Sequence, residues 1–437
     1  MTQNAVYKAS RVANEQVTAW LSDHAVIVED GLIADVLPQS ALPGGIGDTH
    51  EVHDLGDVSL LPGLIEAHAH MHTAAGPDPL YTQFSAFNDS KEFFIARAVD
   101  HIRTTLLSGV TTVRDLGGPT DVVFPVRDAV RAGVIPGPRL QLAGAPITTT
   151  AGHCWFFGSE ADTADEVVRA VREQVKLGAD VIKIMSTGGM FTPTANPRSA
   201  QYPVETLRAA VVEAERLNVQ IVSHCLAAEG VRNCVEAGIH CLIHARWHDS
   251  DFSKKLDYDP DVAQMAADKG IWADPTTGHI MIGDVRIAAG DVPPRIPHWA
   301  VTATTVPEEE HDAVLRDMRE RGVRFVTGLD MGMAHGEFDM SAANAWSFVD
   351  LLGFTNWEAM AASTVDTAES LRLSAETGAI KSGLSADLMA VSGDPANDIQ
   401  DLFKCTDVVM AGKLVKRDGR ALVSCAVRSC ERPLARS

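Results

Sequence analysis

Short apolar segments alternate with longer amphipathic segments along most of the chain, and this alternation limits the possible folds more than any other feature. The apolar segments are rich in Val, Ile and Leu, and Gly or Pro bounds them. Because they are too short for helices, each predicts a strand that is buried on both faces. The eight segments cover residues 60–70, 109–117, 138–147, 179–189, 219–225, 237–245, 269–276 and 322–330.

Helical patterns fill the intervals between these segments. Residues 162–178 form one such pattern, with Asp162 or Thr163 as its N-terminal cap, and Pro203 stands in the first turn of the next. Eight buried strands that alternate with helices predict an α/β fold with a parallel sheet, and eight strands close a (β/α)8 TIM barrel. A doubly wound open sheet is the alternative. The barrel is favoured because polar residues follow nearly every strand, where a barrel gathers its site.

The two ends of the chain have a different pattern. Residues 17–61 contain short alternating strands with a turn at Asp30-Gly31, and the C-terminal part repeats this style with a turn at Asp418-Gly419. We therefore expect both termini to build one small β-sandwich beside the barrel. The predicted division is residues 1–61 and 376–437 for the sandwich and 62–375 for the barrel.

Charge and composition narrow the class of partner. The formal net charge of −21 argues against binding to nucleic acid or anionic membranes, which attract basic surfaces. No segment approaches the roughly 18 consecutive apolar residues of a membrane span, and the polar N-terminus lacks the apolar core of a signal peptide. The seven cysteines have no metal-finger spacing, as expected of reduced thiols. These features predict a cytoplasmic protein that acts on a small molecule.

The most informative motif is His68-Ala69-His70 at the end of the first predicted strand. Side chains two positions apart on a strand point the same way, so both imidazoles can face one metal ion. Taken alone, the pair can equally be two ordinary histidines. Other candidate ligands, however, stand at the ends of four further strands, and a barrel brings these ends together: Lys183, His224, His244 and Asp330.

Imidazole and carboxylate groups bind Zn²⁺ or a similar divalent ion, which activates water and polarises carbonyl groups. An ammonium group is a poor ligand, so Lys183 fits such a site if CO₂ has carboxylated its amine into an anionic bridge. The alternative for Lys183 is an ion pair with Asp330 or another carboxylate. The alternative to a metal-binding role for Asp330 is likewise a purely structural contact with a lysine of the barrel.

Several segments together resemble the metal-dependent amidohydrolase superfamily, and more narrowly its imidazolonepropionase-like and prolidase-like branch. They are LPGLIEAHAH at 61–70, GVTTVRDLGG at 109–118, VIKIMSTGG at 181–189, SHC at 223–225, LIHA at 242–245, GLD at 328–330 and GAIKSGLSADLMAVSGDP at 378–395. The resemblance spans residues 25 to 420 and implies a homo-oligomer.

The resemblance also implies roles for the candidate ligands. His68 and His70 bind the more buried metal, and Asp330 binds the same ion and acts as the base. Carboxylated Lys183 bridges to a second metal held by His224 and His244. Zn²⁺ is the expected ion, with Co²⁺ or Mn²⁺ as alternatives. Family members exist with one metal or two.

Two loops after strands contain candidate substrate contacts. His153 follows the third strand and is assigned to the substrate carbonyl by the resemblance, with Trp155 as part of a pocket wall. Tyr202 and Arg208 resemble the pair that receives a substrate carboxylate in the dipeptidases of this branch. Arg208 can equally be a solvated charge on a helix surface.

Two more candidates lie after the sixth and seventh strands. Relatives carry an acidic residue where this chain has Ile243, and Arg246 follows three positions later, able to pair with a substrate carboxylate or with Asp249 or Asp251. The long connection 277–321 carries His279 and predicts a lid or binding loop with an apolar character.

These observations predict a metal-dependent hydrolase of an amide-type C–N bond, with Asp330 as the proton shuttle. An N-acyl amino acid, aryl amide, phenylurea or carbamate provides the required carbonyl flanked by nitrogen. An Xaa-Pro-like or Xaa-Arg-like dipeptidase is one alternative. A non-catalytic, oligomeric assembly protein with the same barrel is the alternative from a different class.

Overall fold

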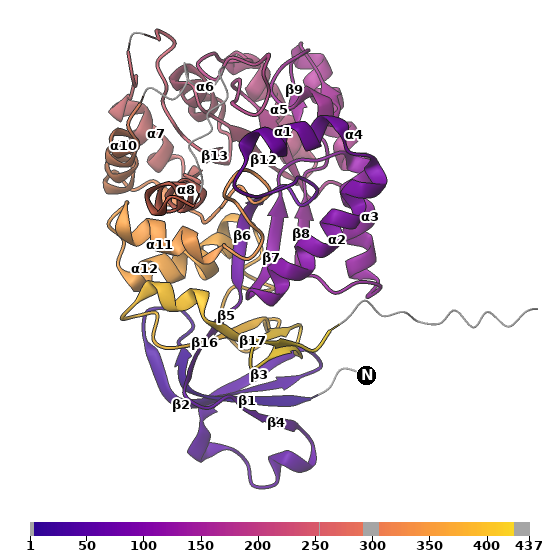
Figure 1. Cartoon of the computed structure of the whole chain (residues 1–437), viewed down its shortest axis with the longest axis vertical. Coiled ribbons are helices and arrows are strands. Elements are labelled where there is room, and N and C mark those ends of the chain that lie inside the picture. The colour runs from indigo at the N-terminus through magenta and orange to yellow at the C-terminus, as the bar shows by residue number, and fades with distance from the viewer. Residues whose placement is uncertain (1–3, 253, 292–305, 424–437) are drawn as a thin grey trace, which may run out of the picture.

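The computed structural model describes residues 4–252, 254–291 and 306–423, and its fold is mixed α/β, as predicted (Figure 1). All eight predicted strand segments contain a strand. These strands are β6 (Leu64–Ala69), β7 (Val110–Asp115), β8 (Arg139–Leu142), β11 (Val181–Met185), β12 (Gln220–His224), β13 (Cys241–Ile243), β14 (Trp272–Asp274) and β15 (Arg324–Phe325).

The eight strands pair in parallel and in the order of the sequence. One sheet has the order β6-β7-β8, and a second runs through the short strands β10 (Ser159–Glu160) and β9 (Ile147–Thr148) and then from β11 to β15. Backbone hydrogen bonds join the two sheets at both edges: the Asp180 amide donates to the Leu142 carbonyl (2.9 Å), and the Ala67 amide donates to the Thr327 carbonyl (2.9 Å). The strand order has no reversal point, which a doubly wound sheet requires.

Burial on both faces explains the continuous apolar runs in these strands. Every residue of β6, β7, β11 and β12 is buried. Ile65, Val181 and Val222 meet in one buried cluster, whereas Leu64, Ile182 and Ile221 belong to a second cluster that includes helix residues. Alternate side chains of a strand therefore point to opposite faces, one toward the other strands and one toward the helices.

Helices cover the outer face of the strands, and the predicted helix ends are observed in α4. The Thr163 hydroxyl accepts a hydrogen bond from the Glu166 amide, and the Glu166 carboxylate accepts one from the Thr163 amide, which together form a capping box. Pro203 immediately precedes α5. The helices around the strands are α1 (Pro79–Asn88), α2 (Lys91–Leu107), α3 (Thr120–Arg131), α4 (Ala164–Leu177), α5 (Val204–Arg216), α6 (Ala228–Ala237), α7 (Pro260–Asp268), α11 (Ala342–Asp350), α12 (Asn356–Ala361) and α13 (Thr367–Ser370). Within the described residues, none of the helices is both long and apolar enough to cross a membrane.

The described parts of the connection 277–321 are largely helical. It contains α8 (Thr277–Ala289) and α10 (Glu308–Glu320). Both helices contribute residues to the cavity described below. The part of the predicted lid between 292 and 305 lies outside the described residues.

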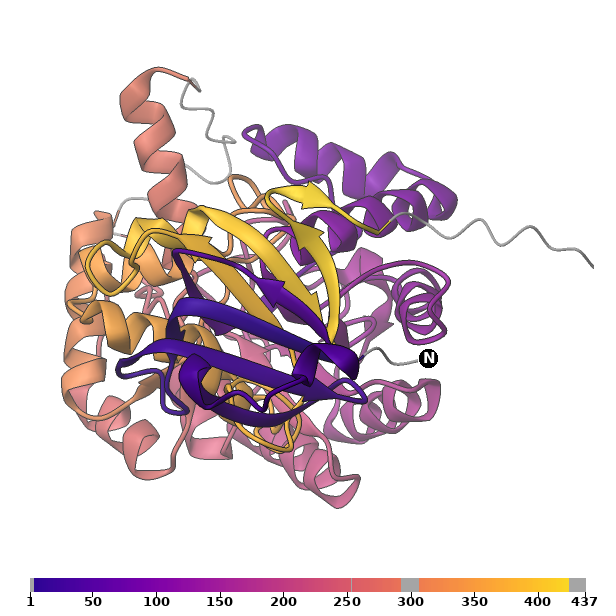
Figure 2. The same cartoon turned by 90° about the horizontal axis from the view of Figure 1, so that it is seen from below.

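Strands from both ends of the chain lie side by side in one sheet below the parallel strands (Figures 1 and 2). Their order is β19-β18-β17-β16-β5-β1-β2-β3, and β4 also pairs with β1. The sheet is therefore continuous from one terminus to the other through the pairing of β5 with β1 and β16. Its strands are β1 (Ala5–Ala13), β2 (Trp20–Glu29), β3 (Leu32–Pro38), β4 (Glu51–Asp54), β5 (Val58–Pro62), β16 (Leu388–Ser392), β17 (Cys405–Met410), β18 (Lys413–Arg417) and β19 (Arg420–Ala421).

Candidate active site

A cavity of about 460 Å³ lies at the carboxyl ends of the parallel strands. It is lined by most of the residues that the sequence predicted to carry chemistry. These residues are His68, His70, His153, Lys183, His224, His244, Arg246, His279 and Asp330.

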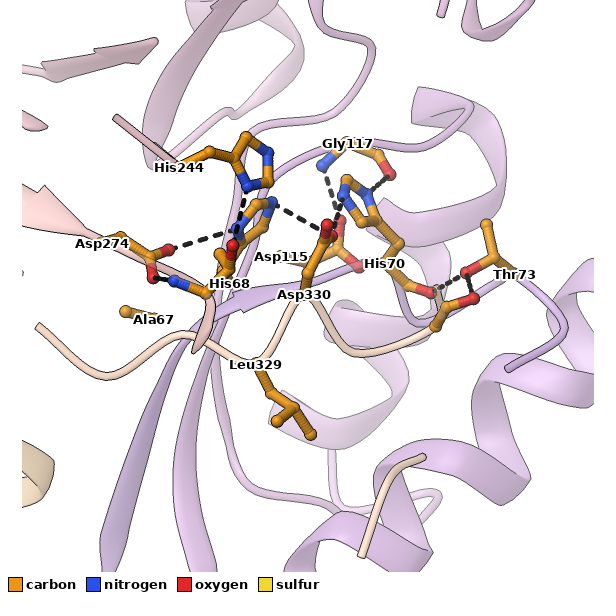
Figure 3. A network of polar contacts seen from close by, with 12 residues as sticks. Ala67, His68, His70, Thr73, Asp115, Gly117, His244, Asp274, Leu329 and Asp330 are labelled. Carbon is orange, nitrogen blue, oxygen red and sulfur yellow. Dashed lines mark hydrogen bonds and ion pairs between the residues drawn. The ribbon is translucent and has the colours of Figure 1, made fainter. Parts of the chain in front are cut away.

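Three of these residues form a compact group that can hold a metal ion. Nε2 of His70 lies 3.2 Å from Oδ1 of Asp330, and Nε2 of His68 lies 3.4 Å from the same oxygen (Figure 3). Their potential ligand atoms all lie within 4.8 Å of one another, and all three residues are buried. The group joins the end of β6 to the segment that follows β15.

The far side of the His70 ring is held in place by the backbone. Nδ1 of His70 donates a hydrogen bond to the Gly117 carbonyl (2.8 Å). Asp115, the last residue of β7, accepts hydrogen bonds from the amides of Gly117 (3.1 Å) and Met71 (2.7 Å), so it fixes the loop around His70 (Figure 3). Because Nδ1 carries the donated hydrogen, Nε2 of the neutral ring keeps its lone pair for a metal.

His68 and His244 are oriented in a similar way by residues at the end of β14 and just after it. Nδ1 of His68 lies 3.2 Å from a carboxylate oxygen of Asp274, and Nδ1 of His244 lies 2.9 Å from the Thr276 hydroxyl. The second oxygen of Asp274 accepts a hydrogen bond from the Thr276 amide (3.3 Å), which connects the two contacts. A carboxylate behind an imidazole fixes the ring orientation and raises its strength as a ligand.

The donor set fits a divalent cation. Oδ1 of Asp330 is buried and accepts no hydrogen bond from any described residue, although two imidazole nitrogens face it. Burial lowers the pKa of His68 to about 4, so its ring is in the neutral form that binds metals. Burial acts to raise the pKa of Asp330, but the imidazoles of His68 and His70 that face its carboxylate hold this pKa well below its ordinary value. Imidazole lone pairs and a carboxylate oxygen thus converge on one point, as in zinc sites.

The backbone at these ligands is strained. His244 has φ of 70° and Asp330 has φ of 60°, and Thr276, which contacts His244, has φ of 51°. Non-glycine residues rarely adopt this left-handed region, which costs of order 1–3 kcal/mol each. Such strain is concentrated at functional sites because the surrounding structure must maintain it.

Lys183 is 2% exposed and lines the same cavity from the middle of β11. No carboxylate of the described residues lies within ion-pair distance of its amine, so the structure does not show the pair with Asp330 that the sequence left open. Burial lowers the pKa of Lys183 to about 8, which makes the neutral amine accessible near neutral pH. The neutral amine is the form that reacts with CO₂.

His224 and His153 line the same cavity as Lys183. The His224 ring lies 4.7 Å from the His244 ring and 4.4 Å from the His153 ring, centroid to centroid. Nε2 of His224 donates to the Gly188 carbonyl (3.1 Å), which leaves Nδ1 as the nitrogen with the lone pair. The four rings of His68, His244, His224 and His153 therefore form a row along the cavity floor.

His153 is positioned by two residues of the loop after β11. The Gln201 side chain accepts a hydrogen bond from the His153 amide (2.8 Å) and donates to the carbonyl of Met185 (2.7 Å). A Cβ atom at Gly189 would lie 2.3 Å from the His153 ring, so this close approach requires glycine. Burial lowers the pKa of His153 to about 3, and its buried Nδ1 has no hydrogen-bond partner among the described residues. The neutral ring is thus available to a substrate.

Comparison with known proteins identifies the family. The amidohydrolase family profile matches residues 59–415, and the profile of the NagA composite domain matches residues 17–55. The chain belongs to the amidohydrolase family. It is 28% identical over 430 residues to ochratoxinase of Aspergillus niger, which covers 91% of this chain and 84% of that protein.

Solved structures agree with this assignment to the amidohydrolases. The A. niger ochratoxinase structure has a TM-score of 0.80 and 25% identity, covering 99% of both chains. A Xaa-Pro dipeptidase with methionine bound in its active site has a TM-score of 0.81 and 25% identity, covering 95% of this chain and all of that one (100%). The predicted membership of the amidohydrolase superfamily is confirmed, and the protein is a hydrolase that acts on C–N amide bonds.

Three predicted substrate contacts of this amidohydrolase lie away from the cavity. Tyr202 is 1% exposed in the hydrophobic core, where its hydroxyl donates to the Ala161 carbonyl (2.6 Å). Arg208 is exposed on α5, and Trp155 is 39% exposed beside Phe156. The structure therefore does not place Tyr202 and Arg208 as a carboxylate-binding pair.

Arg246 and His279 do line the cavity, with partners that differ from those expected. Arg246 pairs with Glu308 of α10 (2.5 Å) rather than with Asp249 or Asp251. Burial lowers the pKa of His279, whose Nδ1 is buried and has no hydrogen-bond partner in the described part of the chain. Both residues line the same cavity as the ligand group.

The sequence analysis missed four residues that support the site. Asp274 and Thr276 contact the rings of His68 and His244, and Asp115 fixes the loop around His70. Glu66 ties together the segments that carry the candidate ligands His68 and Asp330. The buried Glu66 carboxylate accepts hydrogen bonds from the amides of His68 (3.1 Å) and Leu329 (2.7 Å), next to Asp330. Asp115 and Asp274 each end a strand, so the signal that identified the ligands applied to them too.

Proposed function

We propose that this amidohydrolase cleaves the C–N bond of a small-molecule amide, urea or carbamate in a metal-dependent reaction. The observation that carries the proposal is the buried Oδ1 of Asp330, which accepts no hydrogen bond from any described residue and is faced by Nε2 of His68 and His70. The ochratoxinase likeness supports an amide as the substrate class, and Phe157, Met185 and Phe191 in the cavity lining support an apolar part of the substrate. Tyr202 and Arg208 point away from the cavity, so no observation favours the dipeptidase alternative. The family assignment likewise disfavours a non-catalytic assembly protein.

The residue set divides into two possible metal sites. His68, His70 and Asp330 would hold one divalent ion, and Lys183 as its carbamate would hold a second together with His224 and His244. We propose Zn²⁺, because nitrogen and oxygen ligands in this combination suit it. When bound, the ion polarises the substrate carbonyl and lowers the pKa of water.

The side chains supply the proton transfer and the orientation of the substrate. Asp330 is ionised and can take the proton of the attacking water and pass it to the leaving nitrogen. Neutral His153 can donate its N–H to the carbonyl oxygen as negative charge develops there. Phe157, Met185 and Phe191 line the cavity beside His153 and exclude water from that side.

We also propose the architecture that goes with this site. The cycle of backbone hydrogen bonds through the eight parallel strands supports a closed (β/α)8 barrel over residues 62–375. The nine-stranded sheet supports one small β-domain built from residues 1–61 and 376–437.

A substrate panel tests the proposed function. Purified enzyme is dialysed against a chelator, reconstituted with Zn²⁺, Co²⁺ or Mn²⁺, and assayed with N-acyl amino acids, anilides, phenylureas, carbamates and dipeptides. We expect amine release from at least one non-peptide class, lost on chelation and restored by metal. Arg208→Gln on the outer helix surface is the matched control and should behave as wild type. Hydrolysis that is indifferent to chelation, or no hydrolysis in any class, would contradict the proposal.

A further inference from the structure

The wall of the cavity carries a buried positive charge. Arg246 follows His244 by two positions and its side chain is only 10% exposed. A buried guanidinium is always charged and needs an anionic partner, because desolvation without one is expensive. The partner that the structure gives it is Glu308, the first residue of α10, at 2.5 Å.

The two partners of this ion pair differ in how freely they can move. The Glu308 side chain is 44% exposed, whereas Arg246 is enclosed by the cavity wall. Glu308 can therefore turn into solvent and keep its charge hydrated there. Arg246 cannot follow it, so any departure of Glu308 leaves a site for another carboxylate.

Two neutral imidazoles stand beside this guanidinium. His248 and His311 both line the cavity, and their ring centroids are 5.1 Å apart. Burial, followed by the charge of Arg246, lowers the pKa of His248 to about 3 and that of His311 to about 2, so neither ring carries charge. Nδ1 of His248, a residue that is 6% exposed, has no hydrogen-bond partner among the described residues. Nδ1 of His248 is thus a buried polar atom of this wall that can form a hydrogen bond with a ligand.

Apolar side chains also line this cavity, together with the candidate ligands His68, His70 and Asp330. They are Phe157, Met185, Met190 and Phe191. A substrate whose amide carbonyl lies at the ligand group can therefore place an apolar group against these side chains and a charged group at Arg246. Small-molecule sites commonly combine an apolar lining with a few such polar groups that set orientation.

We propose that Arg246 binds a carboxylate of the substrate, that His248 lies beside this subsite, and that Glu308 occupies it until the substrate displaces it. The substrate class is then an N-acyl amino acid with a bulky apolar acyl group and a free carboxylate. This inference rests on the proposed function, because it places the scissile amide at the ligand group. It assigns the carboxylate contact to Arg246, which the sequence offered as one candidate, and not to Tyr202 and Arg208.

A ligand with an ammonium group is the alternative to one with a carboxylate at this wall, and the test must distinguish the two. Asp284 of α8 also lines the cavity, and burial, followed by the charge of Glu308, raises its pKa. An ammonium group held between Glu308 and Asp284 would use the same wall with the opposite charge. The two occupants predict opposite effects of removing the Glu308 charge.

A matched pair of substrates provides the test. N-benzoyl-L-phenylalanine and N-benzoyl-2-phenylethylamine share the scissile amide and the apolar groups and differ in the carboxylate. Steady-state kinetics of the metal-loaded enzyme compares wild type with Arg246→Gln and Glu308→Gln, and with Glu309→Gln as an exposed control on the same helix turn. Metal content and thermal unfolding are measured for each variant in parallel.

We expect Arg246→Gln to raise KM for the acid at least about tenfold and to leave the neutral amide within about twofold, since a charge-assisted contact is lost from one substrate only. Glu308→Gln should lower KM for the acid, because the internal competitor is gone, and Glu309→Gln should change neither substrate. If Arg246→Gln does not fold, the effect of Glu308→Gln on KM still distinguishes a carboxylate from an ammonium group at this wall.

Three results would overturn the inference. One is an equal effect of Arg246→Gln on both substrates. Another is a higher KM of Glu308→Gln for the acid, or a loss of affinity confined to amine-bearing amides, which would assign the wall to an ammonium group. The third is a wild type that hydrolyses neither compound of the pair but does hydrolyse other amides. Failure to hydrolyse any amide in the wider panel would instead reject the proposed function.

Discussion

The strand ends and the region around the start of α5 both carry residues that suggest substrate or metal binding, but only those at the strand ends meet in the cavity. His68, His70 and Asp330 meet within 4.8 Å at the strand ends. Tyr202 is buried in the core, and Arg208 faces solvent. Residues of these types therefore predict a site only where the backbone fixes the direction of their side chains.

Strand geometry explains the difference. Side chains two positions apart on a strand share a face, and parallel strands end at one edge, so the direction and the meeting point both follow from the pattern. The direction of a side chain on a helix depends instead on which face of the helix packs against the rest of the protein. Thr206, Leu207 and Ala210 are the buried face of α5, and this places Arg208 on the outside.

The largest effect is expected at the strand ends, from His70→Ala. This change removes a ligand atom, and losing even a residue that merely orients a ligand typically costs about 10–100-fold in metal affinity or activity. We therefore expect activity to fall to background together with loss of bound metal, measured by kinetics and by elemental analysis of the same sample. Turnover near that of wild type would remove His70 from the site.

Lys183→Ala tests whether the proposed second metal site, which includes His224 and His244, depends on a carbamate of Lys183. We expect loss of activity and of part of the bound metal, because the neutral amine that reacts with CO₂ is gone. Short carboxylic acids such as propionate should restore part of both. A fully active, fully loaded Lys183→Ala enzyme would show that the lysine is a structural residue.

Asp330→Asn separates proton transfer from metal binding. Asparagine keeps the shape and one oxygen but cannot accept the proton, and general acid–base help is worth about 10²–10⁴-fold. We expect kcat to fall by at least the lower of these factors, with a smaller change in KM and much of the metal retained. Asp121→Asn, on an exposed ion pair, is the matched control. A kcat within about threefold of wild type, far inside the general-base range, would point to another proton acceptor, with His153 as the next candidate.

Asp274→Asn tests the residues that support the ligands. The carboxylate 3.2 Å from His68 would become an amide, so the His68 ring loses its charged partner. We expect about a 10–100-fold loss in metal affinity, read from chelator competition, with little change once metal is in excess. An unchanged metal affinity would mean that the contact does not orient His68.

The smallest effect is expected in the segment before α5, from Tyr202→Phe. The change deletes the hydrogen bond to the Ala161 carbonyl and should lower the free energy of unfolding by about 1 kcal/mol. Because Tyr202 does not reach the cavity, kcat/KM should stay at the wild-type value for acidic and neutral substrates. A selective rise in KM for acids would return Tyr202 to the substrate site and break the comparison.

The sequence predicts the eight strands and the six candidate ligands because each buried strand is a short apolar segment, and the candidate ligands lie on these segments, mostly at their ends. It does not predict partners that depend on distant packing. Glu308 is 62 positions from Arg246, and only the placement of α10 brings them together. The pairing of β5 with both β1 and β16 is of the same kind, since alternation identifies strands but not their neighbours. Asp115 and Asp274 had the local signal, at the ends of β7 and β14.

The metal content of the wild-type protein tests the central claim most directly. Protein purified without added metal or chelator is analysed for divalent ions by mass spectrometry, and its folding is checked by circular dichroism. The account predicts at least about one divalent ion per chain, since sites of this donor set bind tightly when preformed. A folded, hydrolytically active protein with no stoichiometric divalent ion would contradict it.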